Sequence, residues 1–154
     1  MTRSSDQLRA QHDALHLAYR WFAFFEAPGS ALAPHLEIFD PQVRLSGHQA
    51  RHLFADDRDS LAAWFSTVPG ERSSHHILHA AFEPAPQGTS RLNMLVAYQA
   101  MRPTGVQGAI IRYETELSHG PDGARFLSLD KTPILPDTQA HFAPSWAANR
   151  VLAL

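Results

Sequence analysis

The sequence predicts one α+β domain, with helices in the first half of the chain and a meander of strands in the second. Apolar residues at helical spacing, interrupted by Pro and Gly, dominate the first half. Four apolar-rich segments of strand length then follow one another across turn residues between positions 73 and 132. Helices followed by consecutive strands favour an α+β fold over alternating βαβ units. The length of 154 residues fits a single domain over 1–154.

Composition excludes several classes of function. The 13 Lys and Arg residues against 15 Asp and Glu residues give a net charge of −2, which leaves no basic field to bind nucleic acid or a membrane surface. The absence of Cys excludes disulfides, thiolate nucleophiles and Cys-bound zinc, and it fits a cytoplasmic protein. The apolar segment 14–25 carries Arg20 and follows Asp13, so we interpret it as a helix of the fold and not as a secretion signal.

Three helices are predicted before the meander. Ser or Asp residues offer capping oxygens at the first and third, where Asp56 is the expected cap of the third. Pro-Gly pairs end these two helices, and Asp40-Pro41 ends the second before a short strand at 43–46. The predicted helices span residues 6–27, 32–39 and 57–68.

Four strands make up the predicted meander. Turn residues rich in Pro and Gly separate them, which indicates antiparallel hairpins. The remainder, 133–154, is expected to be an arm with a short helix that docks on this domain's own cleft or on a neighbouring subunit. The predicted strands span 74–82, 91–101, 109–118 and 125–131.

The first helix places a carboxylate among apolar residues. At about 100° per residue, Glu26 falls on the same stripe as Tyr19 and Phe22, while Trp21 lies on the opposite side, so both sides should be covered. A sheltered Glu26 would have a raised pKa and could act as a general acid or base. The alternative is that Glu26, in the last helical turn, points into solvent.

Three histidines open the first strand of the meander. In a helix His75 and His79 would share a face and could bind zinc, but in a strand they lie roughly 13 Å apart, too far to share an ion. The bounding prolines favour the strand, so no metal site is expected. Alternation then puts His76 on one face with Phe82, and His75 on the other. Either His76 or His75 could be a catalytic imidazole, or the histidines could be structural.

The third strand of the meander has one apolar and one charged face. Tyr113 and Thr115 belong to the apolar face, and Arg112, Glu114 and Glu116 form the charged one. We expect the charged face to meet solvent or a partner subunit.

The order of these elements resembles the nuclear transport factor 2-like superfamily, especially its SnoaL-like branch, from about residue 6 to 133. The resemblance implies a cone-shaped half-barrel, in which three N-terminal helices pack on a strongly curved, mainly antiparallel sheet. It also implies a pocket beside the first helix, and commonly a homodimer through the outer face of the sheet. The motifs that carry it are Phe39-Asp40-Pro41-x-Val43-x-Leu45, Leu61 with Trp64, and Ser74-His75-His76-Ile77.

Site residues of the superfamily can be carried over only in part. The basic and oxyanion-hole Asp residues of ketosteroid isomerases fall near Gly47 and Thr115, so that route is not implied. Scytalone dehydratase compares better, because its carboxylate and its strand His fall on Glu26 and His76. Its two water-holding Tyr positions fall on Phe25 and Gly47, which argues against that particular substrate.

We therefore expect a cofactor-free lyase or isomerase acting on a small, mostly apolar ring or polyketide-like molecule. His76 would move a proton at the substrate, and Glu26 would polarise a water or orient the imidazole. The competing hypothesis is a non-catalytic dimeric ligand-binding or assembly module, including an accessory subunit of a larger oxygenase. The candidate substrate contacts are Tyr19, Phe22, Trp64, Tyr98, Tyr113 and Thr115.

Overall fold

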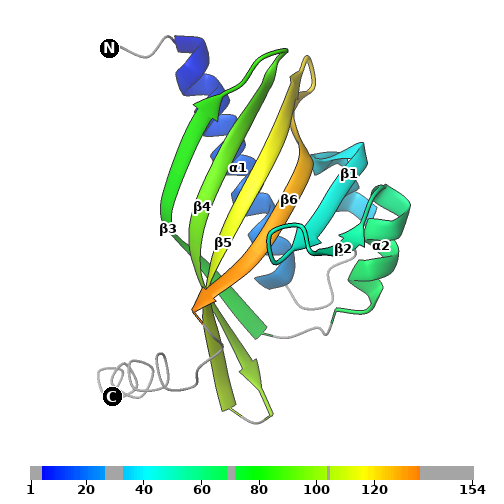
Figure 1. Cartoon of the computed structure of the whole chain (residues 1–154), viewed down its shortest axis with the longest axis vertical. Helices are drawn as coiled ribbons and strands as arrows, with labels where there is room; N and C mark the ends of the chain where they lie inside the picture. Colours follow the sequence, from blue (N-terminus) through cyan, green and yellow to red (C-terminus); the bar gives the residue numbers. More distant parts are fainter. Residues whose placement is uncertain (1–4, 27–32, 69–71, 104, 136–154) are drawn as a thin grey trace.

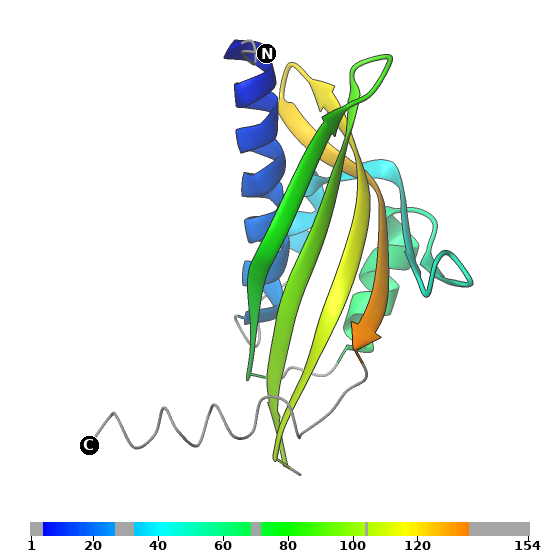
Figure 2. The same cartoon turned by 60° about the vertical axis from the view of Figure 1, so that its left-hand side comes forward.

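The computed structural model describes residues 5–26, 33–68, 72–103 and 105–135. One mixed sheet with the strand order β2-β1-β6-β5-β4-β3 curls around the helix α1 (Figures 1 and 2), which confirms the α+β class and the curved sheet. The elements are α1 (Ser5–Glu26), the 3-10 helix η1 (Ala33–Ile38), β1 (Phe39–Gly47), β2 (His52–Ala55), α2 (Arg58–Ser66), β3 (Arg72–Pro84), β4 (Thr89–Arg102), β5 (Gly105–Gly120) and β6 (Gly123–Leu135).

The expectation of three N-terminal helices is wrong, because the described part of the chain contains two α-helices. The segment predicted as the second helix forms the six-residue 3-10 helix η1, and β1 already begins at Phe39. Pro41 disfavours helical backbone at Asp40. Phe39 is fully buried, with its ring 5.8 Å from that of Phe126 on β6. Burial of the Phe39 side chain in the core favours strand geometry at this residue over another helical turn.

The helix α1 lies across the concave face of the sheet, and its bounds agree with the predicted range to within one residue. Phe22 contacts the sheet while Trp21 contacts Phe39 and Phe65, so the helix is covered on both sides as predicted. The predicted stripe is wrong for Tyr19, which is 59% exposed. The buried stripe follows the three- and four-residue spacing of a helix and comprises Ala14, Leu17, Ala18, Trp21 and Phe22.

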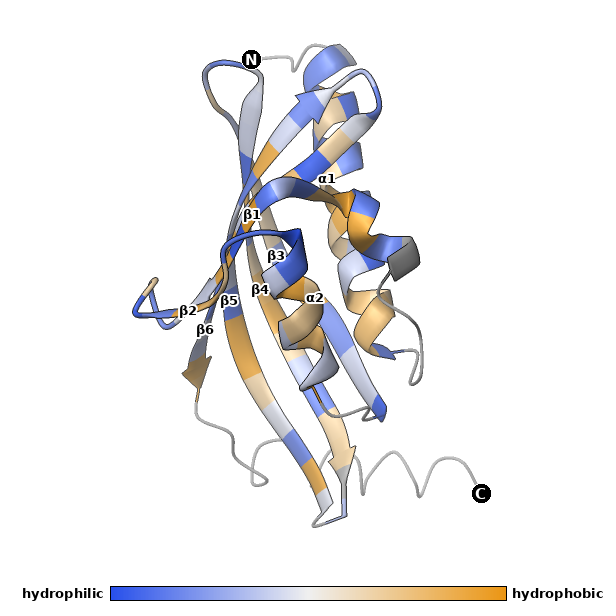
Figure 3. Ribbon diagram, turned by 90° about the vertical axis from the view of Figure 1, so that its right-hand side faces the viewer, coloured by the Kyte–Doolittle hydropathy of each residue, from blue (hydrophilic) through white to orange (hydrophobic). Residues whose placement is uncertain are grey.

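The four strands of the meander are confirmed, and each extends further at both ends than predicted. The strand predicted at 43–46 is the longer β1, which pairs antiparallel with β2 and parallel with β6. This parallel pairing joins segments that lie far apart in the sequence, so local patterns do not reveal it. Apolar and polar residues are interspersed along the strands (Figure 3), and the buried apolar ones pack with those of α1 and α2 in one core. Residues 133–135 of the expected arm belong to β6, and its remainder lies outside the described residues.

A β-bulge interrupts β3 at Leu78. Ile77 pairs with Val96 and His79 pairs with Leu95, so two steps along β3 oppose one step along β4. The extra residue, Leu78, is 57% exposed. Because alternation restarts after a bulge, the residues before it change face relative to a regular strand. This local irregularity decides which histidine points toward α1.

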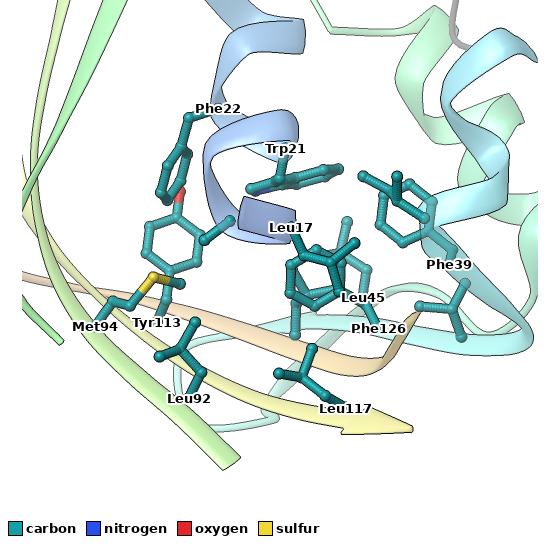
Figure 4. Close-up of a cluster of buried hydrophobic side chains, with 14 of the residues drawn as sticks. Leu17, Trp21, Phe22, Phe39, Leu45, Leu92, Met94, Tyr113, Leu117 and Phe126 are labelled. Atoms are coloured by element: carbon teal, nitrogen blue, oxygen red, sulfur yellow. The ribbon is translucent and has the colours of Figure 1, made fainter. Parts of the chain in front are cut away.

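The core between α1 and the sheet is built from interlocking rings and branched side chains (Figure 4). The Trp21 ring meets those of Phe39 and Phe65 edge to face, at 5.4 Å and 5.3 Å. Such edge-to-face pairs contribute about 0.5–1.5 kcal/mol each beyond the burial of their area. The helix end is therefore held firmly against the sheet.

Asp57 caps α2, in place of the expected Asp56. The Ser60 backbone N–H donates to Asp57 Oδ1 at 2.7 Å, and the Asp57 N–H donates to Ser60 Oγ at 3.1 Å, which completes a capping box. No described helix combines the length and the apolar character that a membrane crossing needs.

Deletion of Leu78 tests the bulge. Removing the one unpaired residue should leave His75 and Ala80 on their present face, so the free energy of unfolding should fall by less than about 2 kcal/mol. Deletion of Ala81 is the matched control. It forces His79 to turn inward, and it should destabilise the fold by clearly more. Urea unfolding followed by Trp fluorescence measures both, and equal losses would contradict the bulge.

Candidate active site

The imidazole of His75 lies on the concave face of β3, under the last turns of α1. Its side chain is 4% exposed. The ring stacks on Phe22 with a centroid distance of 4.9 Å and an interplanar angle of 10°. The rings of Phe25 and Tyr98 lie 5.7 Å and 5.1 Å away. His75 is therefore enclosed by aromatic groups from α1 and β4.

The carboxylate of Glu26 lies next to this imidazole. Glu26 is the last residue of α1, and its Oε1 accepts a hydrogen bond from the backbone N–H of His75. The same oxygen is 3.4 Å from His75 Nδ1, and this nitrogen has no hydrogen-bond partner in the described structure. Ser73 Oγ donates to the Phe25 carbonyl at 3.1 Å and fixes the helix end to β3. Glu26 is less sheltered than expected, since its side chain is 37% exposed.

The structure places His76 on the opposite, convex face of β3, where it is exposed. The expected meeting of Glu26 and His76 is therefore wrong, and it is His75 that lies beside Glu26. The alternation rule failed because the bulge adds one residue, Leu78, between Phe82 and the histidines. His75 therefore lies on the same face as Phe82, and His76 lies on the other. His79 pairs with Leu95 and points outward, so it does not share a face with His75 either. The catalytic role of a histidine stays a prediction.

Burial lowers the pKa of His75 to about 4, although the charge of Glu26 acts in the opposite direction. The imidazole is therefore neutral at neutral pH. A neutral ring with Nδ1 facing a carboxylate can hold its proton on Nδ1 and accept another on Nε2. The arrangement suits a general base that a carboxylate orients.

Five of the six predicted substrate contacts divide into three groups. Phe22 and Tyr98 lie next to His75, and the Tyr113 ring lies behind them, 5.3 Å from that of Phe22. Burial raises the pKa of Tyr113, so its hydroxyl stays protonated. Thr115 is buried, but its hydroxyl donates to the Leu92 carbonyl at 2.8 Å. Tyr19 lies outside the site because it faces solvent.

A cation that the sequence patterns did not reveal lies on the same concave face. Lys131 on β6 holds its Nζ 4.6 Å from the ring centroid of Trp64 and 5.1 Å from that of Phe54. Its charge opposes protonation of His75, and burial lowers its own pKa. Trp64 thus contacts Lys131 and not the histidine. A signal was present, since Lys131 is the sole Lys of the chain.

The convex face carries a separate, polar hollow of about 520 Å³. The prediction that the charged side chains of β5 point away from the core is confirmed, since Arg112 and Glu114 are exposed. Charges of both signs line this hollow, which is open to solvent. They are Arg44, Arg91, Glu114, Glu116 and Asp130.

Comparison with known proteins gives a match in fold alone. No protein-family model and no curated protein match the sequence. A candidate aromatic ring hydroxylase from Novosphingobium aromaticivorans is 12% identical with a TM-score of 0.74, over 86% of this chain and 96% of that one. A candidate scytalone dehydratase from the same organism is 11% identical with a TM-score of 0.70, over 86% and 89%. Nuclear transport factor 2 from Cryptosporidium parvum is 13% identical with a TM-score of 0.66, over 81% and 94%.

These structures show that the chain has the fold of the nuclear transport factor 2-like superfamily. The fold was anticipated from the order of the elements, and the resemblance is confirmed at that level. Because members of one fold carry unrelated activities, the function must be argued from the residues on the concave face.

The pKa of His75 makes stability depend on pH. Above the ordinary His pKa of 6.5, the ring is neutral in the folded and the unfolded chain. As the pH falls from 6.5 to about 4, the unfolded chain binds a proton that the folded chain excludes, so the fold loses up to about 3 kcal/mol. His75→Asn should lack this loss, whereas His76→Asn should keep it. Urea unfolding at several pH values measures the difference, and identical slopes for both variants would contradict a buried neutral His75.

Proposed function

We propose that this chain binds a small, mostly apolar ring or polyketide-like molecule beside His75 and acts on it as a cofactor-free lyase or isomerase. The observation that carries the proposal is the buried imidazole, whose Nδ1 faces the Glu26 carboxylate at 3.4 Å inside an enclosure of aromatic rings. Here the ring is kept neutral and oriented, as a general base requires.

In the proposed reaction, His75 Nε2 removes a proton from a carbon next to a carbonyl group of the ligand. The electron pair of the broken C–H bond forms an enolate, and the imidazolium is stabilised by the carboxylate of Glu26. Return of the proton to another carbon gives isomerisation. Loss of a neighbouring hydroxyl group, which leaves as water after it takes the proton from His75, gives dehydration. Neither reaction needs an oxidant, a reductant or a cofactor, because only protons and water are moved.

The aromatic groups around His75 support a flat ligand. Tyr98, which is half-buried beside His75, presents ring surface on the concave face, and the protonated hydroxyl of Tyr113 is a donor suited to a developing negative oxygen. The ketosteroid isomerase route is not proposed, because Gly47 and Thr115 supply no carboxylate. The structural neighbour described as a candidate dehydratase supports this choice of chemistry without assigning it.

Exchange of carbon-bound hydrogen tests the proposed base. In heavy water the wild-type protein should catalyse the exchange of a carbon-bound hydrogen for deuterium. We expect this at the acidic C–H position of at least one compound in a panel of cyclic ketones and hydroxynaphthalenones. His75→Asn should slow this exchange at least about 100-fold, because general-base catalysis contributes about that factor or more. His76→Asn, a neighbouring substitution on the other face, should leave the rate unchanged. Proton NMR measures the exchange, and equal rates for both variants would rule out His75 as the base.

A non-catalytic dimeric module is the second candidate. It is favoured by the dense packing of Trp21, Phe39 and Phe126 inside the cone and by the polar hollow on the convex face. That hollow mixes Arg and Glu side chains, so two copies related by a two-fold axis could pair opposite charges. The module could be an accessory subunit of a larger oxygenase or a homodimer.

Reversal of a convex-face charge tests the dimer. If two copies pair through this face, Glu114→Arg should weaken association at least about tenfold, because it sets like charges opposite each other. Asp59→Arg, on the exposed surface of α2, is the control with the same change of charge. Sedimentation equilibrium measures the dissociation constant. A wild-type protein that stays monomeric, or a dimer that Glu114→Arg leaves intact, would contradict pairing through this face.

A further inference from the structure

The sole Lys of the chain occupies an inward-facing position. Every other basic residue with a permanent charge is Arg. In the sheet Lys131 pairs with Tyr113 on β5 and with Gly47 on β1, and all three lie in one row on the concave face. An Arg has a planar fork that suits two oxygens, whereas a Lys ammonium is a compact charge that suits one. A Lys at this position therefore suits contact with a single oxygen atom.

The ammonium group of Lys131 has no acidic partner among the described residues. No carboxylate there lies within 4.0 Å of Nζ. The adjacent Asp130 faces the other side of the sheet, where its carboxylate accepts from Ser46 Oγ at 2.7 Å and from the Ala50 N–H at 2.7 Å. Glu26 is engaged with His75. Within the described ranges, the charge of Lys131 is thus held among aromatic rings without a counter-ion.

Two aromatic rings beside Lys131 stabilise its positive charge. Phe54 and Trp64 offer ring faces to Nζ, at 5.1 Å and 4.6 Å. Gly47 makes room for Phe54, since a Cβ at position 47 would come within 2.7 Å of the Phe54 ring. The favourable free energy of two ring contacts offsets only part of the free energy needed to remove an ammonium group from water. An apolar side chain such as Met would cover the same rings without that cost, so packing does not explain the Lys.

We infer that the ligand of the concave face carries a negatively charged oxygen, as a carboxylate, a phenolate or an enolate, and that this oxygen pairs with Lys131. The inference rests on the proposed function, because it takes this face as the ligand site. The charge of Lys131 acts on His75 across this face, so it would also favour an enolate formed there. An anion here would also offset the repulsion that Lys131 exerts on a protonated His75.

A pair of ligands that differ in charge but not in shape tests the inference. Wild-type protein should bind a naphthoate at least about tenfold more tightly than the matching naphthamide at neutral pH, a difference of about 1.4 kcal/mol. Lys131→Met keeps an unbranched side chain over the rings and should abolish this preference while leaving the affinity for the naphthamide within about twofold. Arg51→Met, in the exposed turn before β2, is the control for loss of a positive charge. Isothermal titration calorimetry measures all affinities.

The outcomes separate the inference from the proposed function. Equal affinities for both compounds in the wild type, or a naphthoate preference that survives Lys131→Met, would overturn the role of Lys131 while leaving the ligand site in place. Binding of neither compound to the wild type would overturn the site and the inference together. Urea unfolding gives a second readout. Lys131→Met should be at least as stable as the wild type if the charge serves a ligand, and a clear loss of stability would show a structural role instead.

Discussion

The docking of the C-terminal end of α1 on β3 is the contact on which the rest of the site depends. Trp21 fixes this end from one side against Phe39 and Phe65, and Phe22 fixes it from the other against Tyr113. Phe22 is thereby stacked on His75. Because the helix is rigid, the same docking sets Glu26 at the rim, one turn further along. A helix end held less firmly would leave the imidazole in water with an ordinary pKa.

The two faces of the curved sheet carry different chemistry. On the concave face, ionisable groups are few and His75 is neutral because it is buried, while Lys131 keeps a charge without an acidic partner among the described residues. On the convex face, charges of both signs are open to solvent and screened. Asp130 illustrates the boundary. Burial raises its pKa, but hydrogen bonds from Ser46 and from the 48–50 turn outweigh burial and hold the pKa below its usual value. Its charge thus serves the turn and not Lys131.

The limits of prediction from sequence are clearest in β3. The strand itself was predictable from its apolar residues and bounding prolines, and so was the long helix that ends beside it. The face of each histidine was not, because two-residue alternation holds only while the strand stays regular, and Leu78 interrupts it. The exposed Tyr19 shows the same limit for a helix, since several stripes of α1 are apolar and only the position of the sheet selects one.

The sequence alone determined the α+β class, the span of α1, the order of the meander and the outward charges of β5, because these depend on local periodicity, caps and turn residues. It also placed Glu26 at the end of the helix. The tertiary structure decided what depends on distant partners: the parallel pairing of β1 with β6, the inward turn of His75 in place of His76, and the isolation of Lys131 between Phe54 and Trp64. A strand's register and the burial of a charge are set by its neighbours in space, and the linear pattern does not contain them.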